Sequence, residues 1–427
     1  MQRPIVCKFG GSSTADAACF RRIRSILHAD PRRRFIVVSA PGKLISNSGN
    51  PEAEEKMTDL LLRCHTECSR GLDPDPLLKV VFDRYRDIAR ALELNMDLEL
   101  EFSRIAQSLP TSDAAYAASR GEYLCARLLA AYLHLPFVDT AEMVCFDAQG
   151  HFDAKRTDTR MPALRAMHCA VLPGFYGSAP DGRICTFPRG GSDITGALVA
   201  KAVDASLYEN WTDVDGLLSA DPGLVANPVL IPEISYKQME LLAQAGANVL
   251  QAECLRPTAA AGIPTRIRNT FAPECPGTLI SDCMSSTRPC ISGCGGYVAL
   301  NINFSEKTTV KEIHSTLMAA HTTPLAASVA LDAFRCVFST KQLPAALEVL
   351  RSAFPEAKIR QGEPQALVRI VDPDMHLSDR ALRKLANDTG TSLLGLSRIP
   401  DLRAWQMYCF EKSLKDFINA VYLVLYS

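Results

Sequence analysis

Three turns in this sequence combine glycine with charged side chains, and each follows a run of apolar residues. The first is Lys8-Phe9-Gly10-Gly11-Ser12-Ser13, which ends a strand-like segment and precedes a helix-like one. Two glycines let backbone N–H groups approach an anion closely, while a helix N-terminus and a lysine add favourable charge. This combination is typical of phosphate binding. Two glycines after a strand also occur in plain tight turns, and neither the P-loop nor the dinucleotide-binding glycine pattern is present.

The second and third turns carry acids as well as glycine. Arg189-Gly190-Gly191-Ser192-Asp193 opens a helix-like segment, where Ser192 or Asp193 alone would serve as an ordinary helix cap. An arginine, two glycines and an acid together exceed what a cap requires, which indicates a binding role. Trp211-Thr212-Asp213-Val214-Asp215-Gly216 follows a further strand-like segment, and its acids and glycine could equally form an ordinary turn.

Strand-like and helix-like segments alternate over roughly the first 270 residues. Short apolar runs that end in glycine or another turn residue predict strands, and apolar residues at helical spacing predict the helices between them. This alternation predicts an α/β fold with a mostly parallel sheet, in which ligands bind beyond the carboxyl ends of the strands. The three turns lie at such ends. The predicted strands span residues 4–9, 35–40, 136–138, 170–172, 184–187 and 205–210.

Residues 44–56 interrupt this alternation. They are rich in Ser, Asn, Gly, Pro and Glu and have no hydrophobic period. Such a composition predicts a mobile surface loop, which would be placed to act as a lid.

The chain has 427 residues, more than one core normally holds, so two or three domains are expected. A stretch rich in Pro, Ser, Gly and Cys at residues 272–296 predicts a linker after a first domain at 1–271. Beyond it, strand and helix patterns recur, which predicts two small β-α-β-β-α-β units. We place them at 297–361 and 362–427, with the option that the two units interleave.

Composition excludes several classes of protein. Lys and Arg number 46 against 47 Asp and Glu, so the chain lacks the positive charge typical of nucleic-acid-binding proteins. No segment is apolar enough for a signal peptide or a membrane helix, so we expect a cytoplasmic protein with no membrane partner. Fifteen cysteines are scattered and odd in number, and the groups around Cys64 and Cys275 lack zinc-site spacing. Reduced thiols are expected.

Together the motifs resemble those of the aspartate kinases in the amino-acid kinase family. The resemblance rests on the turn at Lys8, Ser39-Ala40-Pro41-Gly42-Lys43, Thr58-Asp59, Gly121-Glu122, Gly174-Phe175 and the turns at 189–193 and 212–216. In this order the motifs are specific, whereas each alone would be weak. They span most of residues 1–269. The resemblance implies a three-layer α/β/α domain with a mostly parallel sheet, followed by two ferredoxin-like ACT domains.

The activity implied by the resemblance is phosphorylation of the side-chain carboxylate of L-aspartate by ATP with Mg²⁺. The product would be 4-phospho-L-aspartate, which leads to lysine, diaminopimelate, threonine and methionine. Because that carboxylate has a pKa near ~3.9, it is ionised at neutral pH and needs no general base. The barrier is then electrostatic and positional. Lys8 is predicted to stabilise the transferring group with amides of Gly10 and Gly11, and the resemblance implies that Asp193 orients Lys8.

The resemblance also implies how the substrates are held. Arg189 would grip the α-carboxylate of aspartate and Glu122 would pair with its α-ammonium group. Without the resemblance, Glu122 is more simply a solvated acid on a helix. Further contacts are expected from Ser39, Thr58 and Ser192 on the aspartate side, and from Lys8, Thr212 and Asp213 on the nucleotide side.

The nucleotide side departs from the family pattern at three positions. Where the family usually has lysine, tyrosine and arginine, this chain has Asn248, Leu218 and Gly223. Loss of one preorganised cation raises a phosphoryl-transfer barrier by about 2 to 4 kcal/mol. We therefore expect either a slower enzyme or a substitute cation, with Lys43 and Lys237 as candidates. Kinetics of Asn248→Lys test this, because an unchanged or lower kcat/KM for ATP would contradict a deficit at Asn248.

The ACT architecture implies feedback inhibition by an amino acid, with lysine favoured as the effector, and a homo-oligomer formed through the ACT domains. Residues 322–332 do not clearly preserve polar effector contacts, so this expectation rests on architecture alone. Two alternatives stay open. One is a related kinase acting on another acid such as glutamate, and the other is a non-catalytic amino-acid sensor. Retention of Lys8, Glu122, Arg189 and Asp193 counts against the sensor.

Overall fold

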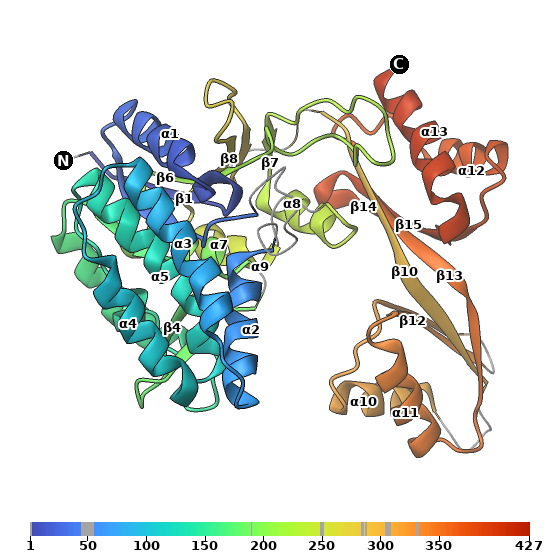
Figure 1. Cartoon of the computed structure of the whole chain (residues 1–427). Helices are drawn as coiled ribbons and strands as arrows, with labels where there is room; N and C mark the ends of the chain where they lie inside the picture. The colour runs from blue at the N-terminus through green and yellow to red at the C-terminus, as the bar shows by residue number, and fades with distance from the viewer. Residues whose placement is uncertain are drawn as a thin grey trace. The chain divides into compact units, whose positions relative to one another are not determined.

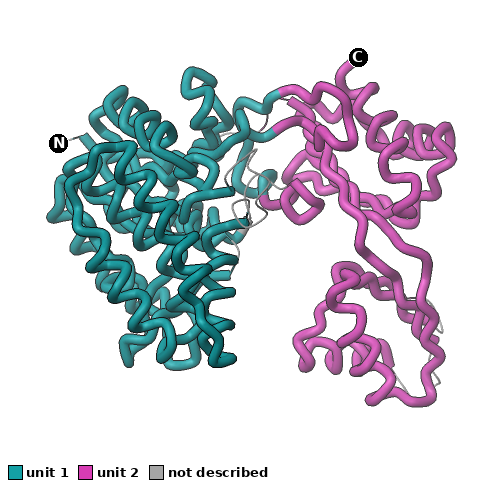
Figure 2. The backbone as a smooth tube through the Cα atoms, viewed as in Figure 1, with its two compact units in different colours: residues 1–217, 230–239, 249–285 teal, residues 218–229, 240–248, 286–427 magenta. Residues whose placement is uncertain are grey.

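A computed structural model describes residues 2–43, 55–188, 190–247, 252–282, 286, 288–303, 309–329 and 333–427. The chain forms two compact units, each built from several segments (Figure 2). The first unit comprises residues 1–217, 230–239 and 249–285, and the second comprises 218–229, 240–248 and 286–427. None of the helices in the described residues is long and apolar enough to cross a membrane.

The central sheet of the first unit has seven strands. Their order is β3 (Ala170–Pro173), β2 (Arg33–Val38), β1 (Ile5–Phe9), β6 (Leu207–Thr212), β8 (Thr265–Asn269), β9 (Thr278–Ile280) and β7 (Glu233–Ile234). The first five run parallel, whereas β9 is antiparallel to β8, and β7 is parallel to β9. The mostly parallel sheet predicted from the sequence is confirmed.

Helices cover both faces of this sheet (Figure 1). Successive side chains of a strand point to opposite faces, so each face presents apolar side chains that the helices bury. In β1, Cys7 and Phe9 enter one hydrophobic core, and Val6 enters the other. The three-layer α/β/α architecture is therefore confirmed. The first core is closed by α1 (Ala17–His28), α2 (Met57–Ser69), α3 (Asp75–Ala91), α4 (Leu98–Ser108) and α5 (Ala114–Leu133). The second core is closed by α7 (Gly191–Ala202) and the 3-10 helix Met161–Ala166.

Shorter elements complete the first unit. They are α6 (Ala154–Arg160), α9 (Ala252–Ala260) and the 3-10 helices Ser12–Thr14, Leu109–Thr111 and Thr140–Glu142. The helix α9 packs against α7, and α8 (Tyr236–Ala243) contributes residues to both units.

Two predicted strands differ from the structure. Residues 136–138 form only one bridge to the sheet, between Phe137 and Val171. The segment at 184–187 forms β5 (Ile184–Thr186), which pairs with β4 (Tyr176–Ser178) in a separate two-stranded sheet. A tight turn in which Gly182 has φ of 85° joins β4 to β5, so this segment folds back locally instead of joining the main sheet. The turn at 189–193 consequently follows a hairpin.

The second unit is built on one antiparallel sheet of six strands. Their order is β11 (Ala326–Val329), β12 (Ala333–Ser339), β10 (Cys290–Asn303), β13 (Lys358–Val371), β15 (Ala404–Phe410) and β14 (Leu393–Ile399). The helices are α10 (Val310–Ala319), α11 (Leu343–Ala353), α12 (Asp379–Asp388) and α13 (Leu414–Tyr426), with 3-10 turns at Pro400–Leu402 and Glu411–Ser413.

The two β-α-β-β-α-β patterns share strands β10 and β13, each 14 residues long. The C-terminal half of β10 pairs with β12 in a core closed by α10 and α11. The N-terminal half of β10 pairs with the C-terminal half of β13, and that half of β13 pairs with β15 in a core closed by α12 and α13. The predicted repeated ferredoxin-like architecture is confirmed, with its sheet continuous through both halves.

The segment predicted as a linker, 272–296, contains regular structure. It includes β9 and the first residues of β10. Small residues here allow close packing, because a Cβ added at Gly293 would lie 2.6 Å from Ile418 Cδ1 of α13. The same composition that suggests a linker thus also fits a strand lying close to a helix. The limits of the catalytic and ACT domains stay predictions.

Candidate active site

A lysine at the end of β1 and an aspartate in the first turn of α7 form the centre of the candidate site. Lys8 Nζ lies 2.6 Å from Asp193 Oδ1, and the two side chains are 9% and 18% exposed. In the parallel pairing of β1 with β6, Lys8 is opposite Asn210. The Asn210 side-chain amide donates to the same Asp193 oxygen at 2.8 Å. Three elements therefore converge on one carboxylate.

The start of α7 depends on two glycines. Gly190 is the N-cap residue and has φ of 77°, a left-handed conformation that side chains with a Cβ rarely adopt. Gly174, which follows β3, lies so close to the helix that an added Cβ would be 2.6 Å from Ser192 Cβ. Because the first amides of a helix carry partial positive charge, the start of α7 favours a negatively charged ligand.

Lys8, Asp193 and the start of α7 line a cavity of about 430 Å³. The polar side chains in its wall are those of Lys8, Ser39, Glu122, Ser192 and Asp193. Phe175, Phe187, Pro188, Gly190 and Gly191 complete the wall. Five of the site residues predicted from the sequence therefore meet in one cavity.

Glu122 is the one acid in this wall besides Asp193. Its side chain is buried in α5, and Oε2 has no hydrogen-bond partner among the described residues. Burial raises the pKa of Glu122 from 4.5 to about 7, opposed by a backbone hydrogen bond from Ala40 and by the positive charges of Lys8 and Arg120. An incoming cation such as an ammonium group would favour the ionised carboxylate. Glu122 is thus not the solvated helix acid that the sequence alone suggests.

The glycine turn after β1 offers fewer free amides than its sequence suggests. Gly10 N donates to Trp211 O at 3.0 Å, so that amide is already engaged. Gly11 O accepts from Gly42 N at 2.7 Å, which ties this turn to the loop after β2. The Gly11 amide has no hydrogen-bond partner among the described residues and remains available to an anion.

Several predicted residues lie outside the cavity wall or outside the described residues. Thr58 is half-buried in the first turn of α2. Thr212 is the last residue of β6 and the exposed Asp213 follows it, and Thr212 Oγ1 donates to Asp213 Oδ1 at 3.1 Å. Arg189, Asn248 and loop residues 44–54 lie outside the described residues, while Lys43 and Lys237, the proposed substitute cations, are exposed.

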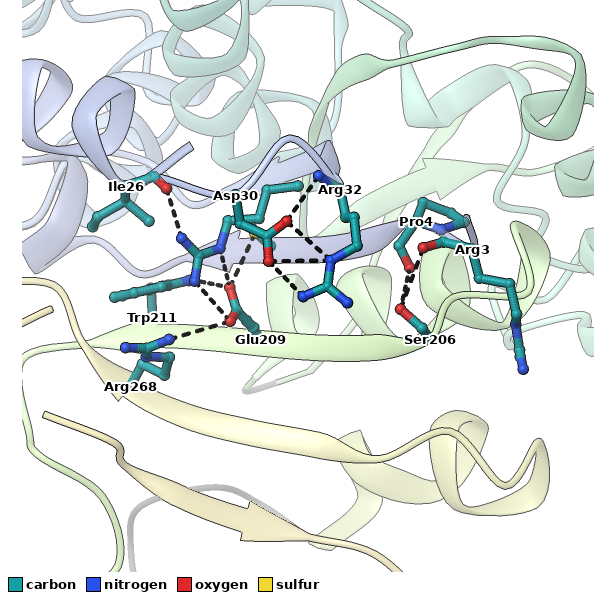
Figure 3. Close-up of polar contacts among 11 residues, drawn as sticks. Arg3, Pro4, Ile26, Asp30, Arg32, Ser206, Glu209, Trp211 and Arg268 are labelled. Atoms are coloured by element: carbon teal, nitrogen blue, oxygen red, sulfur yellow. Dashed lines mark hydrogen bonds and ion pairs between the residues drawn. The ribbon is translucent and has the colours of Figure 1, made fainter. Parts of the chain in front are cut away.

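A second ion pair lies on the opposite face of the sheet, between Glu209 of β6 and Arg33 of β2. Glu209 is 2% exposed and accepts from Arg33 Nε at 2.7 Å and Arg33 Nη2 at 3.0 Å. It also accepts from Trp211 Nε1 at 3.1 Å, and Arg268 Nη1 lies 3.5 Å away (Figure 3). The guanidinium groups of Arg33 and Arg268 also lie over the Trp211 ring. This network was not anticipated from the sequence.

Asn210 was also missed, although β6 carried a signal. Glu209 and Asn210 are adjacent polar residues inside a strand that is otherwise apolar or aromatic. Strand alternation places them on opposite faces, so one of them must face the layer that contains α7. A buried polar side chain needs a partner, which marks both positions for attention.

A three-layer α/β/α unit thus presents a lysine at the end of a sheet strand, beside the start of a helix, to one cavity. The chain belongs to the amino acid kinase family, whose model matches residues 3–269.

Known proteins similar to this chain are aspartate kinases. Aspartokinase 3 of Bacillus subtilis is 36% identical over 297 residues, which are 64% of this chain and 63% of the relative. Chloroplastic aspartokinase 1 of Arabidopsis thaliana is 27% identical over 73% of this chain and 57% of its own length. The matches thus span less than two thirds of these curated relatives. The solved aspartate kinase of Clostridium acetobutylicum is 31% identical with a TM-score of 0.86, covering 99% of this chain and 100% of that structure.

Proposed function

We propose that the protein is an aspartate kinase that transfers the γ-phosphoryl group of ATP to the side-chain carboxylate of L-aspartate. One observation carries the proposal. A single cavity holds Lys8, paired with Asp193, and the unpartnered carboxylate oxygen of Glu122. The ammonium group of Lys8 suits a transferring phosphoryl group, and the carboxylate of Glu122 suits the ammonium group of an amino acid. The similarity to the Clostridium acetobutylicum aspartate kinase over the whole chain supports the same activity.

Lys8 is the proposed stabiliser of the transferring group. Its ammonium group has Asp193 as its one acidic partner among the described residues, which leaves N–H groups for phosphate oxygens. The start of α7 lines the same cavity and adds partial positive charge there, and the Gly11 amide is a further proposed donor. Together these groups oppose the repulsion between an anionic acceptor and an anionic donor.

Aspartate would bind with its ammonium group on Glu122 and its α-carboxylate on Arg189. Ser39 and Ser192 line the same cavity and offer hydroxyl groups, and Thr58 is a further proposed contact. The side-chain carboxylate then attacks the γ-phosphorus. A carboxylate oxygen–phosphorus bond forms, the bond from that phosphorus to the β,γ-bridging oxygen breaks, and ADP leaves with the electron pair.

The nucleotide would enter as its Mg²⁺ complex, in which the metal neutralises phosphate charge. Thr212 and Asp213, at the carboxyl end of β6, are the proposed contacts of the nucleotide, together with Lys8 and the turn at Gly10 and Gly11. We further propose that the ACT sheet binds an amino-acid effector, lysine first among the candidates, and mediates homo-oligomer formation. The expected location is the cytoplasm.

An acyl phosphate trap tests the activity. The full chain is incubated with ATP, Mg²⁺ and hydroxylamine, and with either L-aspartate or L-glutamate, and the hydroxamate is measured. We expect a signal with aspartate that exceeds the glutamate signal and disappears in Lys8→Met. A stronger glutamate signal would identify the related kinase instead, and no signal with either acid would contradict the proposal in favour of a sensor.

A further inference from the structure

We infer that Asn210 is a positioning residue for phosphoryl transfer, because it holds the Asp193 carboxylate in the place where that carboxylate directs Lys8. The inference rests on the proposed function, since it concerns the same cavity. Asn210 does not line that cavity, so it acts through Asp193 and not on a substrate.

The geometry brings three side chains to one oxygen. Lys8 and Asn210 are neighbours in the β1–β6 register and therefore share a face of the sheet. Both lie within hydrogen-bond distance of Asp193 Oδ1, at 2.6 Å and 2.8 Å. Asn210 is 2% exposed, so its contact is shielded from competing water. The Asp193 carboxylate is thus held by the buried amide of Asn210 as well as by Lys8.

The chemistry of an asparagine suits this position. Its amide donates to the carboxylate without adding charge, so the single negative charge of Asp193 remains matched to Lys8. An aspartate in its place would bring a second negative charge beside the first and compete for the lysine. A leucine of similar volume would remove the amide donor. The Asp193 side chain could then rotate, and the Lys8 ammonium group paired with it would move as well.

The backbone of Asp193 is anchored separately. Tyr208, two residues earlier on the same face of β6, donates from its hydroxyl group to Asp193 O at 3.1 Å. Tyr208 thus fixes the main chain of α7, whereas Asn210 fixes the carboxylate. The two residues share a strand face and are both buried, so Tyr208→Phe is a matched control for Asn210→Leu.

Steady-state kinetics give the first test. We expect Asn210→Leu to lower kcat about tenfold or more, because small displacements of a catalytic group are costly, while KM for aspartate changes by less than about twofold. Asn210→Asp should lower kcat at least as far, and Tyr208→Phe should lower it by less than about twofold. Equal kcat losses in Asn210→Leu and Tyr208→Phe would overturn the inference, because general loosening of α7 would then be the cause.

A second test does not depend on activity. Lys8 is acetylated competitively with the exposed Lys79 as internal standard, and peptide mass spectrometry gives the relative rates. We expect Lys8 to react several times faster in Asn210→Leu than in the wild type or in Tyr208→Phe. An unchanged rate would overturn the inference. If the rate rises while the wild type gives no hydroxamate, the positioning contact stands and the proposed function fails.

Discussion

Two largely buried ion pairs lie on opposite faces of the central sheet, one formed by Lys8 of β1 and the other by Glu209 of β6, and the pairs differ in how many partners they have. Glu209 is enclosed by Arg33, Arg268 and Trp211, with Arg33 in a two-pronged contact. Lys8 has Asp193 as its one acidic partner among the described residues, and it faces a cavity of about 430 Å³.

The two ion pairs differ in how many of their hydrogen-bonding groups already have a partner, and not in how deeply they are buried. The side chains of Lys8 and Arg33 are 9% and 8% exposed, so burial does not distinguish them. Where the protein supplies all the partners of a buried charge, removing one partner destabilises the fold, because the remaining charge is left uncompensated. A charge with unused donors beside a cavity can bind a substrate. On the proposed function, one face of the sheet therefore carries the chemistry and the other face carries stability.

The largest effect is expected for Glu209→Gln. The substitution leaves two buried guanidinium groups facing a neutral amide, and breaking such a pair costs about 3 to 5 kcal/mol. The free energy of unfolding of the first unit should fall by that amount, measured by urea denaturation. The kcat of the protein that remains folded should stay within about twofold of the wild type. If Glu209→Gln were as stable as the wild type but had a low kcat, the Glu209 face would serve catalysis and not stability.

The second largest effect, on the activation barrier, is expected for Lys8→Met. Removing one preorganised donor from a transfer site costs about 10²- to 10³-fold in kcat, which corresponds to about 3 to 4 kcal/mol of barrier. The hydroxamate assay measures this change. Arg24→Met serves as the control, because Arg24 is a cation of the same unit that stacks on Tyr132 away from the cavity wall. Equal activity in Lys8→Met and Arg24→Met would contradict the role of Lys8.

The pH dependence of Glu122 gives a smaller effect with a definite sign. Its pKa is raised from 4.5 to about 7, so between these values the unfolded chain loses a proton that the folded protein keeps. Stability from the neutral carboxyl group is therefore fully present below pH 4.5 and is lost as pH rises through 7. At about 1.4 kcal/mol per pKa unit, the loss is about 3 kcal/mol.

Glu122→Gln should not show this loss. Between pH 5 and pH 8, its free energy of unfolding should rise relative to the wild type by up to about 3 kcal/mol, measured by urea denaturation at both values. If Glu122 binds the ammonium group of aspartate, KM for aspartate in the wild type should fall as pH rises from 6 to 8. A KM in Glu122→Gln with the same pH dependence would exclude Glu122 as the titrating group.

The sequence located the site better than it described the strands around it. The glycine turns and their charges led to Lys8 and Asp193, because such turns follow strands and strand ends meet at one edge of a parallel sheet. Glu122 was reached only through the family resemblance, since it lies inside helix α5. The engaged amide of Gly10 was not predictable, since its partner Trp211 O lies about two hundred residues away in the chain.

The missed features have a common cause. Glu209 and Asn210 are satisfied by residues remote in sequence, and hydrophobic patterning cannot identify such partners. The first residues of β10, 290–296, were predicted as part of a linker, because glycines such as Gly293, where α13 packs closely, interrupt the apolar pattern of a strand. Strand β5 has the same kind of short apolar run as a strand of the main sheet, so only the short turn that joins it to β4 distinguishes it.

The central claim is that the two ion pairs divide stability from chemistry, and one unfolding measurement tests it most directly. The chain has two tryptophans, Trp211 in the first unit and Trp405 in the second, so Trp405→Phe leaves fluorescence that follows the first unit alone. In that background, urea unfolding is compared for Lys8→Met and Glu209→Gln. We predict that Lys8→Met loses less than about 1 kcal/mol while Glu209→Gln loses about 3 kcal/mol or more. Equal losses in the two variants would contradict the account.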